Sequence, residues 1–263
     1  MPVEIAKILV SHGELPVALT VCSDPEKMVG LADPILNLGK LKLSLGLKML
    51  KENNVDRVIM AGKIPNKSIY SPSVFLDPTS LKIFMTSRKD DHSLLESVVS
   101  WLDSEGIKVL PYASYIAKCV APEGIISTRA PNDVEKKDIE HGEKILKAIL
   151  PFSFGQSIAV ADEAILAVEA MEGTDGMILR SGELLREKMA KRNGTVVKMM
   201  WADQDERYDL PTIGPGTIES VHKAGLSCIA VESGRTLIME YDKVLEKAER
   251  YDIAIWGLKK QIN

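Results

Sequence analysis

Three aspartates lie close together in the segment ADQDERYDLPTIGPGT, residues 202–217. They are Asp203, Asp205 and Asp209. Carboxylate oxygens are hard ligands, which suit Mg²⁺ better than zinc or copper. Pro211 disfavours a helical conformation at the residue before it, so we expect Asp209 to lie at a strand end or in a loop. The segment predicts a magnesium site, and a solvated acidic loop is the alternative interpretation.

The same segment ends in features that suit an anion. Gly214 and Gly216 allow the backbone to approach a ligand closely, and a helical pattern begins at Thr217. The first N–H groups of a helix have no partner within the helix and favour a negative charge. Carboxylates on one side and anion-binding amides on the other would fit a magnesium ion that bridges to a phosphate.

A second candidate for phosphate binding is LAVEAMEGTDGM, residues 166–177. A predicted strand delivers Glu169, Glu172 follows it, and Gly173 with Thr174 forms a turn in which threonine caps the next helix. Such a turn would cradle a phosphate, although an ordinary capped connection between a strand and a helix explains the same residues.

Other catalytic devices are less well supported. Lys40, which follows a glycine at a predicted helix start, is a candidate phosphate contact or else an ordinary surface lysine. The four histidines are scattered, and the three cysteines lack the C-x-x-C spacing of a zinc site. The stretch GPGTIE, residues 214–219, lacks the third glycine of a dinucleotide-binding fingerprint.

The elements around these motifs alternate between helix and strand, which predicts an α/β fold with a parallel sheet. Helices are expected at 1–13, 39–54, 92–106, 133–150, 175–191, 217–224 and 242–250. Strands are expected at 15–22, 55–62, 107–111, 157–162, 165–170, 195–200, 227–232, 236–241 and 253–258. The polar, proline-bearing stretch 128–138 predicts a domain boundary. We therefore expect a Rossmann-like domain over 1–130, a linker and connecting helix over 131–150, and a catalytic α/β domain over 151–263.

Composition limits the class of partner. The chain has 263 residues, 45% of them hydrophobic, and a formal net charge of −4, which argues against nucleic acid as a partner. Its apolar runs are far shorter than the roughly 20 residues that cross a bilayer, and no secretory leader is visible. We expect a soluble, cytoplasmic protein.

Several of these segments together resemble the UDP-2,3-diacylglucosamine pyrophosphatases of lipid A biosynthesis, of the kind without a metallophosphoesterase fold. The resemblance covers nearly the whole chain, with weaker matches at GKL, MAGKI and DDHSLLESV in the first half. The strongest matches are FGQ (154–156), LAVEAMEGTD (166–175), QDERYDLPTIG (204–214) and AGLSCIAVESGRTLI (224–238).

The resemblance implies Mg²⁺- or Mn²⁺-dependent hydrolysis of UDP-2,3-diacylglucosamine to UMP and 2,3-diacylglucosamine 1-phosphate. Water would attack the phosphorus next to uridine while two domains close around the substrate. It also implies a homodimer and transient contact with the inner face of the membrane, because the substrate is an amphipathic nucleotide-sugar lipid.

The family's motif D-x-P-T-x-G makes Asp209 the essential carboxylate and a metal ligand, with Asp205 as a second ligand. Arg207 would add a positive charge or hold Asp205 or Asp209 in place by a paired hydrogen bond. The expected substrate-binding residues are Lys40, Gln156, Glu172, Gly173, Thr174, Asp175, Gln204, Arg207, Thr212 and Gly214.

One departure from the family concerns the start of the chain. Family members open with a strand and a loop of the type IAGGGxLP, and Met1 and Pro2 fall where that loop would end. The comparison predicts about ten to fifteen upstream residues that form a central strand and a phosphate loop. A start codon assigned too far downstream or a divergent member would explain this, and we favour the first. Adding those residues is then expected to raise stability and activity together.

Two other functions fit the same motifs. A non-catalytic protein that binds nucleotide sugars or lipid phosphates would keep the pocket without turnover. A pyrophosphatase for another nucleotide diphosphate would share the pyrophosphate-binding residues and differ in its contacts with the acyl chains.

Overall fold

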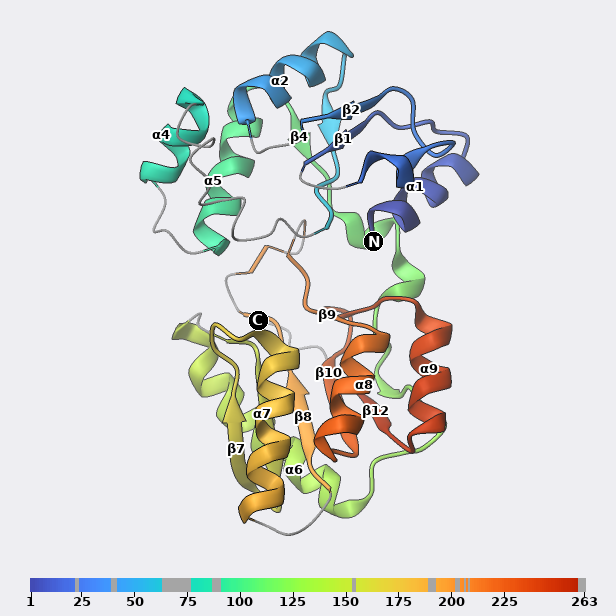
Figure 1. Cartoon of the computed structure of the whole chain (residues 1–263), viewed down its shortest axis with the longest axis vertical. Coiled ribbons are helices and arrows are strands. Elements are labelled where there is room, and N and C mark those ends of the chain that lie inside the picture. The colour runs from blue at the N-terminus through green and yellow to red at the C-terminus, as the bar shows by residue number, and fades with distance from the viewer. Residues whose placement is uncertain are drawn as a thin grey trace. The chain divides into compact units, whose positions relative to one another are not determined.

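Figure 1 shows the computed structural model of the chain, which divides into two compact units, Met1–Ile116 and Ala117–Asn263. The division lies earlier in the chain than the expected boundary near 128–138. The structure describes residues 1–21, 24–38, 42–62, 77–86, 91–152, 155–188, 193–201, 204–205, 207 and 209–259.

The first unit combines helices with short parallel strand pairs. Strand β1 pairs with β2, and β3 pairs with β4, both in parallel. A Rossmann-like domain is not confirmed, because the described strands form two separate two-stranded sheets rather than one continuous sheet. The elements are α1 (Pro2–Ser11), β1 (Ala18–Thr20), η1 (Pro25–Met28), β2 (Ile35–Asn37), α2 (Leu43–Glu52), β3 (Arg57–Val58), α4 (Pro78–Thr86), α5 (Asp91–Ser104), β4 (Lys108–Val109) and η3 (Tyr112–Ser114).

The second unit is built on a mixed six-stranded sheet with the order β5-β12-β10-β8-β6-β7. Strands β8, β10 and β12 are parallel to one another, β5 and β6 run antiparallel to them, and β7 is antiparallel to β6. The elements are η4 (Ala117–Cys119), β5 (Gly124–Ile125), α6 (Asp133–Ile149), η5 (Leu150–Phe152), β6 (Ser157–Ala161), β7 (Ala164–Val168), α7 (Gly173–Lys188), β8 (Thr195–Lys198), β9 (Thr212–Ile213), α8 (Pro215–Ala224), β10 (Cys228–Glu232), β11 (Leu237–Ile238), α9 (Tyr241–Arg250) and β12 (Ala254–Leu258).

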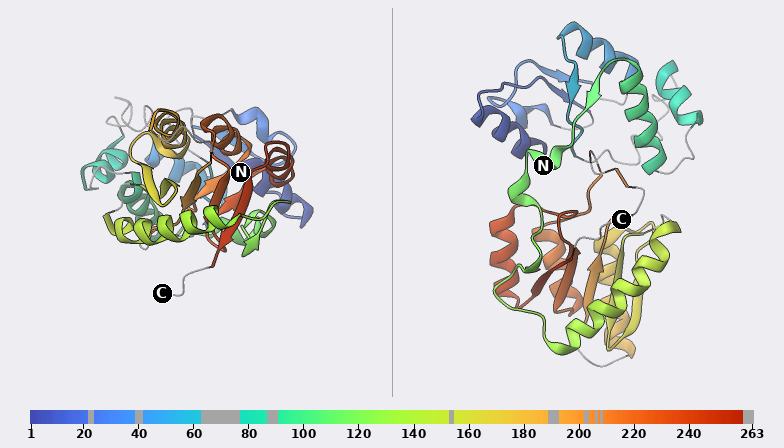
Figure 2. Two further views of the ribbon diagram at one scale, coloured as in Figure 1. Left: turned by 90° about the horizontal axis from the view of Figure 1, so that it is seen from below. Right: turned by 180° about the vertical axis from the view of Figure 1, so that it is seen from behind.

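Helices cover both faces of this sheet (Figure 2). Helix α6 packs on one face, where Leu146 meets Val197, whereas α7, α8 and α9 pack on the other, where Ile218 lies in one cluster with Val196. Successive strand residues point to opposite faces, so the adjacent Val196 and Val197 of β8 belong to different cores. The central strands are therefore buried on both sides.

Local signals explain where the helices begin and end. Asn132 caps α6, and the side chain of Glu135 accepts a hydrogen bond from the backbone N–H of Asn132, which completes a capping box. Helix α8 has proline in its first turn and stops at Gly225, whose φ of +78° is a conformation that glycine adopts without strain.

The α/β class and the expected helices of the second unit agree with the structure, but the expected strand over 236–241 is wrong. Only Leu237 and Ile238 are extended, and they pair in parallel with β9 outside the main sheet. Tyr241 already begins α9. Only two residues of the segment pair with another strand, so its apolar composition predicted a longer strand than the structure forms.

Candidate active site at one edge of the sheet

Both segments predicted to do chemistry lead to the same edge of the six-stranded sheet. Strand β8 ends at Lys198, and the antiparallel register places Ser157, the first residue of β6, opposite Lys198. The register between β6 and β7 places Val168, the end of β7, beside Ile158. This edge, which we call the β8 edge, therefore gathers the start of β6, the end of β7 and the connection from β7 to α7.

Lys198 lies at the centre of the β8 edge and is only 3% exposed. Its Nζ donates to Thr174 Oγ1 at 2.7 Å and lies 3.5 Å from Ser157 Oγ. Thr174 in turn donates to Glu169 Oε1 at 3.1 Å. The second oxygen of Glu169 accepts from the backbone N–H of Gln156 at 3.4 Å. These contacts tie β6, β7, β8 and the start of α7 together through polar side chains.

The charges near Lys198 are mostly negative. Burial lowers the pKa of Lys198, since an apolar environment disfavours the ammonium form, while Glu169, Asp175 and Asp209 act in the opposite direction. These three carboxylates therefore lie close enough to interact electrostatically with one buried cation. Lys198 thus has as charged neighbours both Asp175, which follows the predicted phosphate-binding turn, and Asp209 from the acidic segment.

In the acidic segment, Arg207 holds Asp205. Its Nε lies 2.9 and 3.0 Å from the two carboxylate oxygens, and Nη2 donates at 2.7 Å. The backbone N–H of Asp209 donates to the carbonyl of Asp205 at 3.1 Å, which fixes the backbone that carries Asp209. Of the two alternatives for Arg207, the structure therefore shows pairing with Asp205.

The loop after β8 is fixed by contacts across the edge. Trp201 donates from Nε1 to the carbonyl of Gly155 at 2.8 Å, and its backbone N–H donates to Gln204 Oε1 at 3.2 Å. A Cβ on Gly155 would lie 2.0 Å from the carbonyl oxygen of Glu169, so only glycine fits there. Gln156 Oε1 is buried without a hydrogen-bond partner in the described part of the chain.

The remaining expected site residues lie as follows. Glu172 forms an ion pair with Arg180 and is exposed, and this contact lowers its pKa. Gly173, with φ of +77°, begins α7, while Gly214 is the N-cap of α8. Helix α8 thus begins two residues before the expected Thr217. Thr212 donates to the carbonyl of Leu210 at 3.1 Å. Lys40 and Asp203 lie outside the described residues.

Three residues of the β8 edge are absent from the sequence-based set. They are Ser157, Lys198 and Glu232. Glu232 ends β10, is 1% exposed and accepts from the backbone N–H of Met200 at 3.0 Å. For Lys198, the sequence offered one signal, which is a single lysine in the otherwise apolar run TVVKMM. A lysine in a buried strand is rare, because charged side chains are almost never fully buried unless they are paired.

Among the described residues, no three His, Cys, Asp or Glu side chains are grouped so that they could hold a metal ion. Both oxygens of Asp205 accept from Arg207, which offsets the charge that this residue would offer a cation. Magnesium usually binds through one or two carboxylates together with waters and substrate phosphates.

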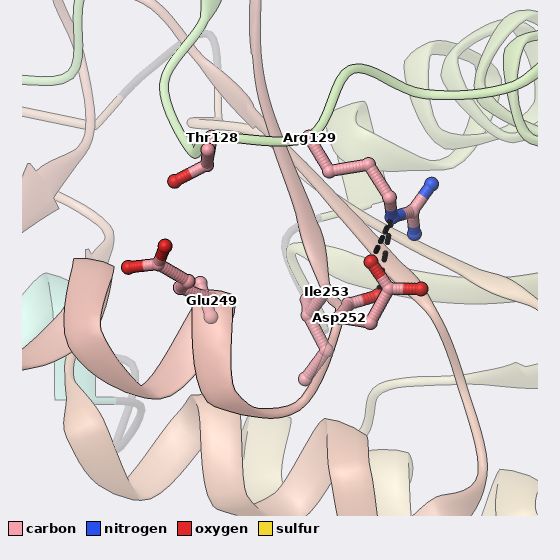
Figure 3. A pocket seen from close by; sticks show the side chains of 6 residues that line it. Thr128, Arg129, Glu249, Asp252 and Ile253 are labelled. Carbon is pink, nitrogen blue, oxygen red and sulfur yellow. Dashed lines mark hydrogen bonds and ion pairs between the residues drawn. The ribbon is translucent and has the colours of Figure 1, made fainter.

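A pocket of about 350 Å³ lies at the opposite edge of the same sheet (Figure 3). Its lining includes Thr128, Arg129 and Ile253, and Ile253 directly precedes β12. Arg129 is occupied by an ion pair with Asp252 at 3.2 Å and by contacts with the buried Glu135. Because β8, β10 and β12 are parallel, this pocket lies at their amino ends, whereas Lys198 and Glu232 lie at carboxyl ends.

Family models match nearly the whole chain: the LpxI N-terminal domain matches residues 1–119 and the LpxI C-terminal domain residues 122–256. The chain belongs to the LpxI family. It is 29% identical to the UDP-2,3-diacylglucosamine pyrophosphatase LpxI of Caulobacter vibrioides over 274 aligned residues. That alignment covers 99% of this chain and 95% of the relative.

The LpxI C-terminal model contains every element of the β8 edge. The motif D-x-P-T-x-G with Asp209, the turn with Thr174 and the buried Lys198 all fall within residues 122–256.

Proposed function

We propose that this chain hydrolyses the pyrophosphate bond of UDP-2,3-diacylglucosamine and releases UMP and 2,3-diacylglucosamine 1-phosphate. Membership of the LpxI family and the near full-length match to a pyrophosphatase of that name support this proposal. The observation that carries it to particular residues is the electrostatic grouping of Asp209, Asp175 and Glu169 around buried Lys198.

In this reaction the oxygen of water forms a bond to the phosphorus next to uridine, and the bond from that phosphorus to the bridging oxygen breaks. The bridging oxygen leaves with the sugar 1-phosphate, and the water releases a proton to the solvent. A pyrophosphate already carries negative charge, so hydrolysis needs positioning and stabilisation of charge more than a covalent nucleophile. Asp209, held by its backbone contact with Asp205, is the proposed carboxylate at the reacting group.

The direct test is to incubate the purified chain with UDP-2,3-diacylglucosamine in ¹⁸O-water. UMP that carries ¹⁸O is expected, because water attacks the phosphorus that UMP retains. Label in the sugar phosphate would show attack at the other phosphorus. Substrate binding without UMP would favour a non-catalytic binding protein, and faster release from UDP-N-acetylglucosamine or a CDP-linked lipid would favour another substrate.

We propose that turnover requires Mg²⁺ or Mn²⁺. Asp209 would hold the ion together with the substrate's phosphates, and the ion would neutralise developing charge and acidify a bound water. EDTA is expected to abolish UMP release, and added MgCl₂ to restore it. Full turnover in EDTA after extensive dialysis would refute the requirement.

We also propose transient contact with a membrane surface and a homodimer. Within the described residues, no helix combines the length and apolar character needed to cross a bilayer. Phe152 and Met171 are the most exposed large apolar side chains described in the second unit, at 74% and 104%. Phe152 precedes β6 and Met171 follows β7, which places both next to the β8 edge, where an acylated substrate would arrive. Light scattering on the purified chain tests the dimer.

A further inference from the structure

Among the described residues, Lys198 is the only lysine or arginine that is buried. Glu135 and Glu232, each 1% exposed, have an arginine within 4.0 Å. Lys198, at 3% exposed, forms no ion pair in the described part of the chain, and its two hydrogen-bond partners are hydroxyl groups. Burying a charge without an opposite charge in contact disfavours folding. Lys198 is therefore hard to explain as a residue selected for stability.

The location of Lys198 suggests what offsets that cost. It is the last residue of β8, and its Nζ reaches Thr174 in the first turn of α7. Thr174 Oγ1 accepts from Lys198 and donates to Glu169, so a single position of this hydroxyl makes both contacts. The ammonium group thus fixes where α7 begins relative to the strand that leads into the acidic segment.

The charge of Lys198 also matters for a substrate that is itself negative. Glu169, Asp175 and Asp209 would repel a pyrophosphate, and Lys198 is the cation on which all three act. Charge–charge energies scale inversely with the local dielectric constant, so a cation shielded from water acts more strongly than an exposed one. A buried lysine can therefore offset the carboxylates without being displaced by solvent.

We propose that Lys198 is a positioning residue of the hydrolase site, which holds Thr174 by a hydrogen bond and offsets the charges of Asp175 and Asp209 when the pyrophosphate binds. This inference rests on the proposed hydrolysis and extends it to a residue outside the family motifs quoted above. Lys198 acts through Thr174, so its effect on turnover depends on the Thr174 hydroxyl.

The test compares Lys198→Met with the wild type. Methionine has a similar length and no charge, so the fold should tolerate it. We expect kcat to fall on the order of 100-fold, because Thr174 loses the contact that positions it. KM should rise by up to about tenfold, because the carboxylates that repel the pyrophosphate are no longer offset, and the melting temperature should stay equal or rise. Thr195→Val is the matched control, because Thr195 is likewise buried and lies at the other end of β8 from Lys198. It should leave turnover unchanged.

A double-mutant cycle shows whether Lys198 acts through Thr174. Thr174→Val is expected to lower kcat, whereas Thr174→Ser should keep most of the wild-type kcat. Adding Lys198→Met to Thr174→Val should lower kcat by less than about threefold further. Independent, multiplicative losses would show that Lys198 does not act through Thr174.

Other outcomes also contradict the inference. A Lys198→Met variant with near-normal kcat, or one whose melting temperature falls in step with its activity, would show that Lys198 has no special role in turnover. Wild-type chain that releases no UMP under the same conditions would instead refute the hydrolase function on which the inference rests.

Discussion

At the scale of single residues, the two aspartates of the acidic segment have different environments. Asp205 is held by Arg207 through both oxygens, and a paired contact of this kind fixes geometry as well as charge. Asp209 instead interacts electrostatically with Lys198 at the β8 edge. We therefore propose that Asp205 supports the loop and that Asp209 takes part in the hydrolysis.

This assignment predicts a large difference between two matched variants. Asp209→Asn keeps the shape and removes the charge, so kcat should fall on the order of 100-fold or more while substrate affinity changes by less than about tenfold. Asp205→Asn should reduce kcat by about tenfold or less, because it weakens only the support. UMP release and calorimetric binding would measure both effects. Near-normal turnover by Asp209→Asn would remove Asp209 from the mechanism.

At the scale of elements, the start of α6 depends on one buried carboxylate. Glu135 receives two hydrogen bonds from Arg129, one from Ser227 at 2.6 Å and one from the Asn132 amide at 2.8 Å. Burial acts to raise the pKa of Glu135, but these hydrogen bonds outweigh it and the pKa is lowered. The carboxylate thus joins the cap of α6 to the strand that follows Ser227.

The lowered pKa of Glu135 predicts a pH-dependent contribution to stability. A carboxyl with a lowered folded-state pKa stabilises the fold above its unfolded pKa of about 4.3, and this contribution is lost as pH falls through the folded-state value. Glu135→Gln should reduce the free energy of unfolding by about 3 kcal/mol at pH 7.

Urea unfolding at pH 7 and near pH 3.5 checks this prediction, and the difference between the two proteins should shrink at the lower pH. Comparing the variant with the wild type cancels the opposite contribution of Asp138, whose pKa is raised by burial. A difference that is independent of pH would show that the charge of Glu135 does not stabilise α6.

Close packing between α7 and α8 gives a second prediction at this scale. A Cβ on Gly182 would lie 2.5 Å from the Cα and carbonyl oxygen of Ala224, whereas a Cβ on Gly216 meets nothing within 4 Å. Gly182→Ala should therefore destabilise the chain by about 1–3 kcal/mol through overpacking. Gly216→Ala should leave it equal or up to about 1 kcal/mol more stable, since alanine favours helices.

Denaturant unfolding of the two glycine variants measures these changes. Equal stability of both would mean that the helices separate easily at Ala224, contrary to the tight contact in the structure.

Long elements were predictable, whereas short ones were not. Helix α6 has a capping residue and an apolar stripe, and both signals lie within the segment itself, so its expected range of 133–150 nearly matches Asp133–Ile149. Strands β2, β5 and β9 have two or three residues each, which is too few to show a period. Their pairing partners decide that they are extended.

At the scale of the whole molecule, the protein must accommodate two chemically different parts of one substrate. Its pyrophosphate needs a polar, charged site, and its acyl chains need an apolar surface. The polar cluster with Lys198 and the exposed Phe152 and Met171 all belong to the second unit and flank the same strands. The proposed contact with a membrane surface can therefore be tested separately from catalysis.

Replacing Phe152 and Met171 together with serine should reduce binding to vesicles of phosphatidylethanolamine and phosphatidylglycerol. Burial of two such side chains in lipid predicts a change on the order of tenfold or more in the partition coefficient. Val134, which is half-exposed at the start of α6, gives the control variant Val134→Ser. Co-sedimentation measures binding, and equal partitioning of all variants would contradict the proposed contact.

The sequence by itself determined the alternation of helices and strands, the family resemblance and the acidic motif that contains Asp209. Each of these depends on residues close together along the chain, where spacing reports directly on chemistry. Only the tertiary structure decided that Ser157, Thr174 and Lys198 meet, because that meeting follows from the antiparallel register of β6 and β8 and from the docking of α7. Register is set by how the apolar faces pack.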